Sequence, residues 1–154
     1  FRRAIPAALE EIGRKTVAAF GFRERFFHME FFKEAADRYA ALSINVRPPG
    51  GFSVDMMNFQ CDFDLYRVYA HMVATGKRPT DVERRYNVAH ASRRHGNTYR
   101  HSHDALVYCL RNRLMAHLPV PEVFSAEMGN YTYLIRDPDE SALREAIAMV
   151  QERG

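Results

Sequence analysis

The sequence has few cysteines and no long apolar run. Its two cysteines, Cys61 and Cys109, lie far apart and show no metal-ligand spacing. This usage favours reduced thiols in the cytoplasm, because disulfide frameworks belong mainly to secreted domains. No apolar stretch approaches the roughly 18 residues that a membrane helix needs, and no signal peptide is recognisable. We therefore expect a cytoplasmic protein that does not span a membrane.

Several patterns that would identify other protein classes are also missing. There is no internal repeat, no low-complexity segment and no Gly-x-x-x-x-Gly-Lys-Ser/Thr loop of the kind that cradles phosphates. The formal net charge is +3, a mild imbalance that bears on solubility more than on fold. With 154 residues, of which 47% are hydrophobic, the chain is long enough for one core or two closely joined subdomains.

Helix and strand signals alternate along the chain after an evident hairpin. This predicts an α/β or α+β fold, in which a mixed or antiparallel sheet is layered with helices. The expected helices cover residues 5–20, with Gly21 as a stop, 56–60, a segment capped by Asp62 and ended by Gly76, 103–111, 121–128, and a last helix capped by Asp137 with Leu143, Ile147 and Val150 buried. The expected strands cover residues 25–33, 38–47, 86–91, 114–120 and 131–136. A joint at Lys77, Arg78 and Pro79 divides the chain into regions 1–79 and 80–154.

The most informative stretch is the hairpin at residues 26–51 with its Pro-Pro-Gly-Gly turn. A period of two places one set of side chains on a single face, and Ala40, Leu42, Ile44 and Val46 on a dry opposite face. The polar face is expected to carry His28, Glu30 and Phe32 from the first strand and Tyr39, Ala41, Ser43, Asn45 and Arg47 from the second. A carboxylate, an amide and a guanidinium on one face can hold a metal ion and a phosphate, which points to nucleotide chemistry.

Two segments of this stretch, FFHMEFF and SINVRPPGG, carry a resemblance to a known family. They are similar to the closing part of the ATP-grasp catalytic domain, in which a strand bearing Glu is followed by a strand reading Glu-x-Asn and commonly x-Arg-Pro. The similarity covers residues 20–75 closely, and the rest of the chain more loosely. It implies the C-terminal half of an ATP-grasp fold, with 1–79 as the end of the catalytic core and 80–154 as an α/β subdomain packed on it.

The resemblance also implies roles for individual residues. Glu30 and Asn45 correspond to ligands of Mg²⁺, or of Mn²⁺ in its place, and Ser43 stands beside them. Arg47 corresponds to the residue that holds a phosphoryl group, and Gly50 and Gly51 to a turn near the nucleotide. Asp55 and His28 are weaker candidates for substrate contacts. Mg²⁺ prefers such oxygen ligands, shared with substrate phosphates.

The implied activity is an ATP-dependent carboxylate–amine or carboxylate–thiol ligase. ATP phosphorylates a small carboxylic acid, and an amine then attacks the acyl phosphate. Ser43 stands where the family usually has a bridging Glu, and the family's lid and N-terminal domain precede the matching part. We therefore expect a C-terminal fragment that needs these upstream parts of the same polypeptide and is inactive alone. A homodimer is left open.

Two other interpretations stay open at this point. Because Ser43 brings no charge, the protein is alternatively an impaired ATP-grasp descendant that binds a nucleotide or a partner without turnover. The basic turn with Arg93, Arg94 and Arg100 around Tyr99 suggests a nucleic-acid-binding module, although we favour a solvated turn. His95, His101, His103 and Cys109 suggest a transition-metal site, but their spacing fits no established pattern.

Overall fold

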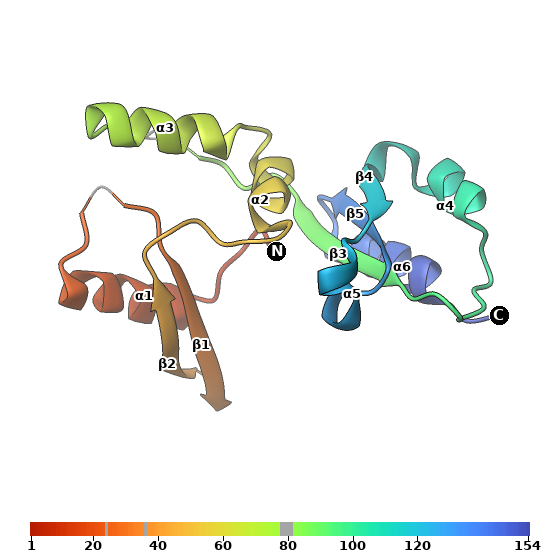
Figure 1. Ribbon diagram of the computed structural model, residues 1–154. Coiled ribbons are helices and arrows are strands. Elements are labelled where there is room, and N and C mark those ends of the chain that lie inside the picture. The colour runs from red at the N-terminus through yellow and green to blue at the C-terminus, as the bar shows by residue number, and fades with distance from the viewer. Residues whose placement is uncertain (24, 36, 78–81) are drawn as a thin grey trace. The chain divides into compact units, whose positions relative to one another are not determined.

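The computed structural model describes residues 1–23, 25–35, 37–77 and 82–154. This part of the chain forms a mixed α+β structure with six α-helices and two small antiparallel sheets. It divides into two compact units (Figure 1). The hairpin unit comprises Ala4–Val54 and Phe63–Val82, and the three-stranded unit comprises Phe1–Arg3, Asp55–Asp62 and Glu83–Gly154. Arg78, Pro79 and the expected boundary at 79/80 lie outside the described residues.

The hairpin unit begins with helix α1, Ala7–Phe20. Pro6 occupies the N-cap with an extended ψ of 132°, so the helix starts two residues later than the apolar spacing suggested. Gly21 ends it with a left-handed φ of 66°, as predicted, and its amide donates to Ala18 O. The exposed face of the helix carries the ion pairs Glu10–Arg14 and Glu11–Lys15, which are spaced one turn apart.

Strands β1, His28–Ala35, and β2, Arg38–Asn45, form an antiparallel hairpin in the same unit. Strand β1 is shifted relative to the expected 25–33, whereas β2 begins at Arg38 as expected and ends two residues before the expected 47. The register slips between Glu30 and Phe31, which interrupts the expected alternation of faces. Leu42, which the pairing skips, is 56% exposed, and Val46, which lies beyond the end of β2, is 47% exposed, so the face that was expected to be apolar and buried is only partly buried. Met29 reaches α1, where a Cβ added at Gly13 would meet its Cε at 3.5 Å.

Two helices follow the hairpin. Helix α2, Ser53–Cys61, is longer than the expected turn at 56–60, and helix α3, Leu65–Thr75, ends at Gly76 as predicted. The predicted cap of α3 was wrong by two residues: Asp64, not Asp62, accepts a hydrogen bond from Arg67 N. Asp62 has a positive φ of 51° and an ion pair with Arg136. Asp62 therefore lies in the turn that precedes the helix, and its side chain pairs with Arg136 instead of capping the helix.

The three-stranded unit contains a sheet in the order β3-β5-β4. Its strands are β3, Asn87–Arg93, β4, Leu114–Pro119, and β5, Tyr131–Asp137, close to the expected ranges. The central strand β5 is buried over four consecutive residues, 132–135, because both of its edges are paired and both faces are covered. The two edge strands, β3 and β4, both pair with β5, and both pairings are antiparallel.

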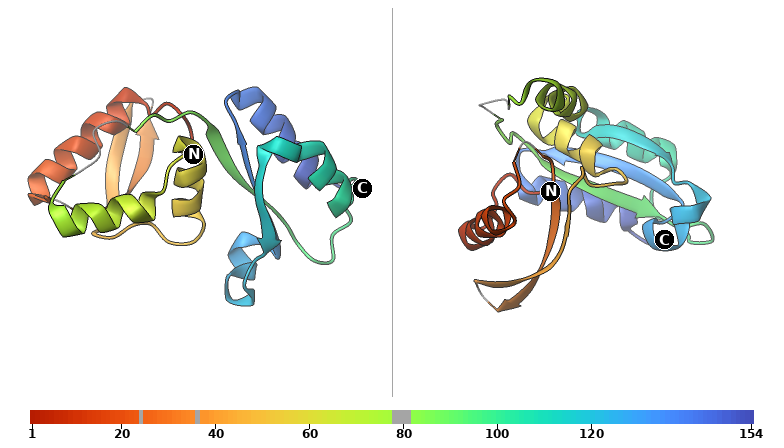
Figure 2. Two further views of the ribbon diagram at one scale, coloured as in Figure 1. Left: turned by 90° about the horizontal axis from the view of Figure 1, so that it is seen from above. Right: turned by 60° about the vertical axis from the view of Figure 1, so that its left-hand side comes forward.

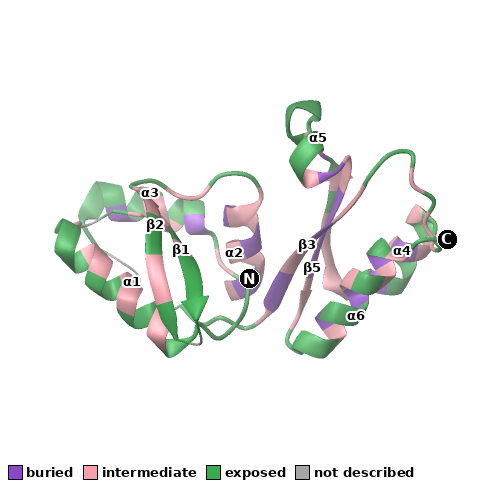
Figure 3. Cartoon of the chain, turned by 90° about the horizontal axis from the view of Figure 1, so that it is seen from below, coloured by how far each residue is buried: buried purple, intermediate pink, exposed green. Residues whose placement is uncertain are grey.

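Helices α4, His103–Leu110, and α6, Glu140–Gln151, belong to the same unit, and α6 packs along β3 and β5 (Figure 2). Figure 3 shows buried residues on β3, β5 and α6, whereas the hairpin strands are mainly intermediate or exposed. The core is a single cluster of apolar side chains that these elements share. Its buried members are Ala91, Leu106, Leu110, Tyr133, Ile135, Leu143, Ala146 and Val150.

Short connections complete this unit. A 3-10 turn, Arg111–Arg113, links α4 to β4, and helix α5, Glu122–Met128, ends at Gly129 before β5. The cap of α6 is Asp139, which accepts from Ala142 N, and not Asp137 as the Asp-Pro pattern predicted. Leu143 and Val150 are buried as expected, while Ile147 is intermediate. Among the described residues, no helix combines the length and apolarity required to cross a membrane.

Candidate functional site

The hairpin brings four of the candidate residues together on adjacent cross-strand positions. His28 lies opposite Asn45, and Glu30 lies opposite Ser43. Ser43 Oγ donates a hydrogen bond to Glu30 Oε2 at 2.5 Å. Positions two apart on a strand share a face, so these four side chains form one polar group, here called the hairpin quartet (His28, Glu30, Ser43 and Asn45). Glu30 is exposed, and the other three are partly buried.

The donor chemistry of the hairpin quartet fits part of a Mg²⁺ coordination shell. It offers one carboxylate, one amide oxygen and one hydroxyl, which are hard oxygen ligands. Over residues 1–23, 25–35, 37–77 and 82–154, no group of three or more His, Cys, Asp or Glu side chains is gathered around a potential metal position. A cation at Glu30 would therefore take further ligands from phosphate oxygens and water, as Mg²⁺ commonly does in nucleotide sites.

Arg47 lies just beyond the hairpin quartet. Strand β2 ends at Asn45, so the alternation that was expected to carry Arg47 onto the same face stops short of it. Its side chain is exposed, and its Nη1 donates to Pro48 O at 3.0 Å. With no acidic partner among the described residues, the guanidinium stays available to a phosphoryl group.

The two glycines after Pro49 form a turn into α2. Gly51 has a φ of 61°, and Ser53 N donates to Gly50 O at 3.4 Å. A Cβ added at either glycine would meet no atom within 4 Å, so Gly51 is needed for its backbone conformation and not for space. Asp55 follows in the first turn of α2 and belongs to the three-stranded unit, while the hairpin quartet belongs to the hairpin unit.

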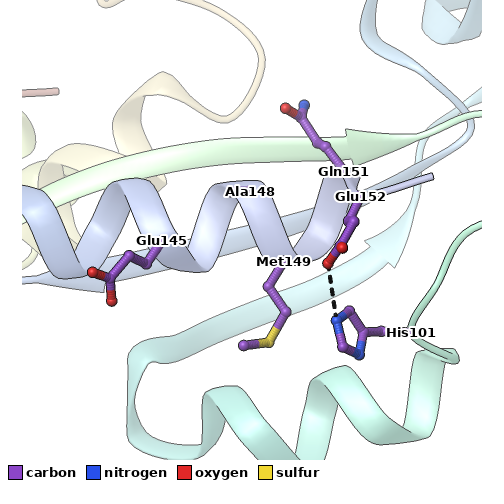
Figure 4. A pocket seen from close by; sticks show the side chains of 6 residues that line it. All are labelled: His101, Glu145, Ala148, Met149, Gln151 and Glu152. Atoms are coloured by element: carbon purple, nitrogen blue, oxygen red, sulfur yellow. Dashed lines mark ion pairs between the residues drawn. The ribbon is translucent and has the colours of Figure 1, made fainter. Parts of the chain in front are cut away.

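The histidines near residue 100 are directed to different partners. His101 Nε2 lies 3.3 Å from Glu152 Oε2, beside Met149 at the end of α6 (Figure 4). His103 Nδ1 lies 3.0 Å from the hydroxyl of Tyr133. Cys109 is a free, exposed cysteine on α4. His95 and His103 line one cavity, but among the described residues no group of three or more potential metal ligands comes together.

The basic turn is largely bonded within the protein. Arg100 Nη1 lies 2.6 Å from Glu152 Oε1, and this hydrogen bond is the main reason why the pKa of Glu152 is lowered. The Arg94 guanidinium donates to carbonyls near the end of α5, at Ser125, Ala126 and Glu127. A nucleic-acid interface needs cationic side chains that are free to bind phosphates. Most of the cationic side chains of this turn are instead bonded to groups within the protein.

Sequence reasoning missed a cavity at this turn. It has a volume of about 470 Å³ and lies in the three-stranded unit between residues 93–99 and strand β5. Tyr131 and Tyr133 enter it from alternate positions of β5, with ring centroids 5.4 Å apart. The sequence had indicated the basic turn with Arg93, Arg94 and Tyr99, which lines the cavity, but the two tyrosines spaced by two on a strand are equally typical of ordinary packing.

Comparison of the chain with models of protein families, with curated proteins and with solved structures gives no match.

Proposed function

We propose that the hairpin unit supplies the metal- and phosphate-binding end of an ATP-grasp-type site, in a protein that ligates a small carboxylic acid to an amine or thiol. The observation that supports this most directly is the hairpin quartet, in which Glu30, Ser43 and Asn45 share one face through the pairing of β1 with β2. The resemblance of SINVRPPGG to the family motif is the second support.

Each residue of the proposed site would have a role that follows from its chemistry. Glu30 would hold a Mg²⁺ ion through its carboxylate, and Asn45 through its amide oxygen. Arg47, with its exposed guanidinium, would steady the transferred phosphoryl group and the acyl phosphate. The bound metal ion would neutralise charge on the phosphates. The two free cysteines agree with a reduced compartment, so we propose the cytoplasm as the site of action.

A second candidate function rests on Ser43. The Ser43 hydroxyl carries no negative charge. The hydrogen bond that it donates to Glu30 also occupies one lone pair of the carboxylate. A site with a single carboxylate binds one cation more weakly than a site with a bridging pair. The alternative is therefore a descendant of the same family that binds a nucleotide with little or no turnover.

The metal site can be tested on this chain by paramagnetic broadening. Mn²⁺ added to ¹⁵N-labelled protein with ATP should broaden the amide signals of residues 28–30 and 43–45 first. Glu30→Gln should abolish the selective broadening because it removes the only carboxylate of the hairpin quartet. Glu34→Gln, on the same strand and also exposed, is the matched control and should leave it unchanged. Broadening that is insensitive to Glu30→Gln would remove the proposed site.

The two candidate functions separate in a turnover assay. A polypeptide that also contains the lid and N-terminal domain that the proposal requires is mixed with Mg-ATP, candidate acids and candidate amines. Release of ADP that requires both acid and amine identifies a ligase. Nucleotide-dependent thermal stabilisation without ADP release identifies the binding protein.

A further inference from the structure

The cavity beside strand β5 has an aromatic wall and a cationic rim. The wall is formed by Tyr99, His103, Tyr131 and Tyr133, and the rim by Arg93, Arg94, His95, Gly96 and Asn97. Among the residues that the structure describes, no acidic side chain lines it. It is a shallow pocket, largely open to solvent, with a volume of about 470 Å³, which lies within the range of small-molecule sites, roughly 300–1,000 Å³.

Arg93 is the residue that gives the cavity its charge. Its guanidinium lies 4.4 Å from the ring centroid of Tyr99 and 5.8 Å from that of Tyr133. Two backbone carbonyls hold it: Nε donates to Val150 O at 2.7 Å and Nη1 to His101 O at 2.8 Å. In the part of the chain that the structure describes, Arg93 has no carboxylate partner, and its buried Nη2 has no hydrogen-bond partner.

Such a cation is costly unless a negative charge comes close to it. A partly buried guanidinium whose neighbours are neutral carbonyls, the Tyr133 phenol and aromatic rings keeps its full charge in a medium of low dielectric constant. Tyr133 cannot supply the anion at neutral pH, because burial raises the pKa of its phenol. The positive potential is therefore left for an anion that enters from solvent.

The aromatic wall suggests the rest of the ligand. The ring of His103 lies 5.2 Å from the ring of Tyr131, at 79° to it, and 5.8 Å from that of Tyr133, at 43°. The histidine is fixed by its Nδ1 contact with the Tyr133 hydroxyl, and Tyr131 by a 3.0 Å contact with His117 Nδ1. Preorganised rings of this kind favour a flat unsaturated group, which stacks at low entropic cost.

We propose that this cavity binds a small aromatic anion, in which a carboxylate or phosphate group is held near Arg93 and a flat ring lies against the partly exposed Tyr99 and Tyr131. The site is separate from the hairpin quartet and does not depend on the proposed ligase function, because all of its lining residues belong to the three-stranded unit.

The test is an NMR titration of the full chain, followed at the amides of Gly96 and Asn97 in the rim. The probes are benzoate, phenyl phosphate, inorganic phosphate and neutral benzamide. We expect saturable shifts with benzoate or phenyl phosphate, and the stronger of the two identifies the acidic group. Benzamide should bind at least about tenfold more weakly, because it lacks the charge-assisted hydrogen bonds. Inorganic phosphate should also bind more weakly, because it lacks the ring.

Two arginine variants give the matched comparison. Arg93→Gln should weaken binding by about tenfold or more. Arg153→Gln removes the same charge from the neighbourhood of Tyr99, whose ring Arg153 contacts at 5.1 Å, but Arg153 does not line the cavity and its loss should change affinity by less than about twofold. Equal effects of the two variants would overturn the proposal. The proposal would also be overturned if the unaltered protein bound benzamide as tightly as benzoate, or inorganic phosphate as tightly as phenyl phosphate. These comparisons need no variant, so the test stays decisive if Arg93→Gln fails to fold.

Discussion

At the scale of single residues, Gly129 shows how closely the three-stranded unit is packed. It has a φ of 85° and is buried. A Cβ at this position would lie 2.8 Å from Ser92 Oγ and 3.0 Å from Arg93 O. The neighbouring residue is also fixed, since Asn130 N donates to Arg93 O at 2.8 Å. Both the backbone conformation and the available space therefore require glycine.

Gly129→Ala should lower the free energy of unfolding by about 2–4 kcal/mol, because the strained φ and the steric overlap act together. Gly96→Ala is the matched control: its φ is 80°, but a Cβ there would meet no atom within 4 Å. It should cost only about 1 kcal/mol. Urea denaturation of both variants measures the difference, and equal losses would show that the space around Gly129 is not tight.

The burial of His90 should make the free energy of unfolding depend on pH. It lies on β3 opposite Leu134, and burial lowers its pKa below the ordinary value of 6.5. The unfolded chain therefore binds a proton more readily than the folded one. The stability that the neutral ring contributes is present above about pH 6.5 and is lost as the pH falls toward the folded-state pKa.

The free energy of unfolding of the unaltered protein should accordingly fall more steeply between pH 7.5 and 5.5 than that of His90→Gln, which cannot be protonated. His71→Gln, at an exposed position of α3, is the control and should keep the slope of the unaltered protein. Chemical denaturation at a series of pH values gives both slopes. Parallel curves for the unaltered protein and His90→Gln would contradict the assignment.

The shared polar face of His28, Glu30, Ser43 and Asn45 was predicted from the sequence, because residues two apart on a strand point to the same side. The pairs Glu30–Ser43 and His28–Asn45 were not predicted, because they lie beyond a register slip. The slip between Glu30 and Phe31 could not be predicted. A bulge depends on how the strand packs on its surroundings, and a local sequence pattern does not contain that information.

At the scale of elements, the start of α6 shows why local signals can be misread. Pro138 suits the first position of a helix, which favoured Asp137 as its cap. However, Asp137 is the last residue of β5 and is paired with Asn87, so it is held in the extended strand. Asp139 is the next residue whose side chain can accept a hydrogen bond from the helix, and it does so at 2.8 Å.

Asp139→Ala should therefore lower the free energy of unfolding by about 1 kcal/mol, since the Ala142 amide loses its acceptor. Asp139→Asn keeps an acceptor oxygen at the cap and should cost clearly less. Thermal or urea unfolding of the two variants measures the difference. An alanine variant as stable as the asparagine variant would show that the cap hydrogen bond contributes little.

The hairpin offers a second test at this scale, through Ser43→Glu. Two carboxylates would then face each other at positions 30 and 43, which destabilises the metal-free hairpin by about 0.2–1 kcal/mol. Mg²⁺ bridges such a pair, so the variant should bind Mg-ATP more tightly than the unaltered protein and gain more thermal stability from it. Unchanged metal dependence would mean that position 43 does not face the cation.

At the scale of the whole molecule, the two compact units differ in how they are stabilised. The three-stranded unit has a core of side chains that are almost fully buried, such as Val88, Leu106 and Ile135. The hairpin unit has a two-stranded sheet in which Phe32 is 60% exposed and Leu42 56%. A two-stranded hairpin is marginally stable by itself, so local opening should be much easier there.

Amide hydrogen exchange should show this difference directly. We expect the slowest exchange at residues 132–135 of β5, and exchange that is orders of magnitude faster at β1 and β2. Gly129→Ala should accelerate exchange along β3 and β5. Hairpin amides as protected as those of β5 would contradict this description.

The order of elements was largely predictable, because apolar periodicity marks each helix and strand of the three-stranded unit. The cavity was not predictable. It forms only when residues 93–99 fold back over the end of β5, and that path is set by contacts between distant residues, such as His95 N with Asn130 Oδ1 at 2.9 Å. No local pattern of residues in the sequence predicts such a contact.

The last three residues are fastened to the same loop: Tyr99 forms a β-bridge with Arg153, Arg100 N donates to Glu152 O, and Gly154 N donates to Thr98 O. A purification tag fused directly after Gly154 will therefore pull on the segment that shapes the cavity. A long spacer, or a tag at another position, should preserve the geometry for binding studies.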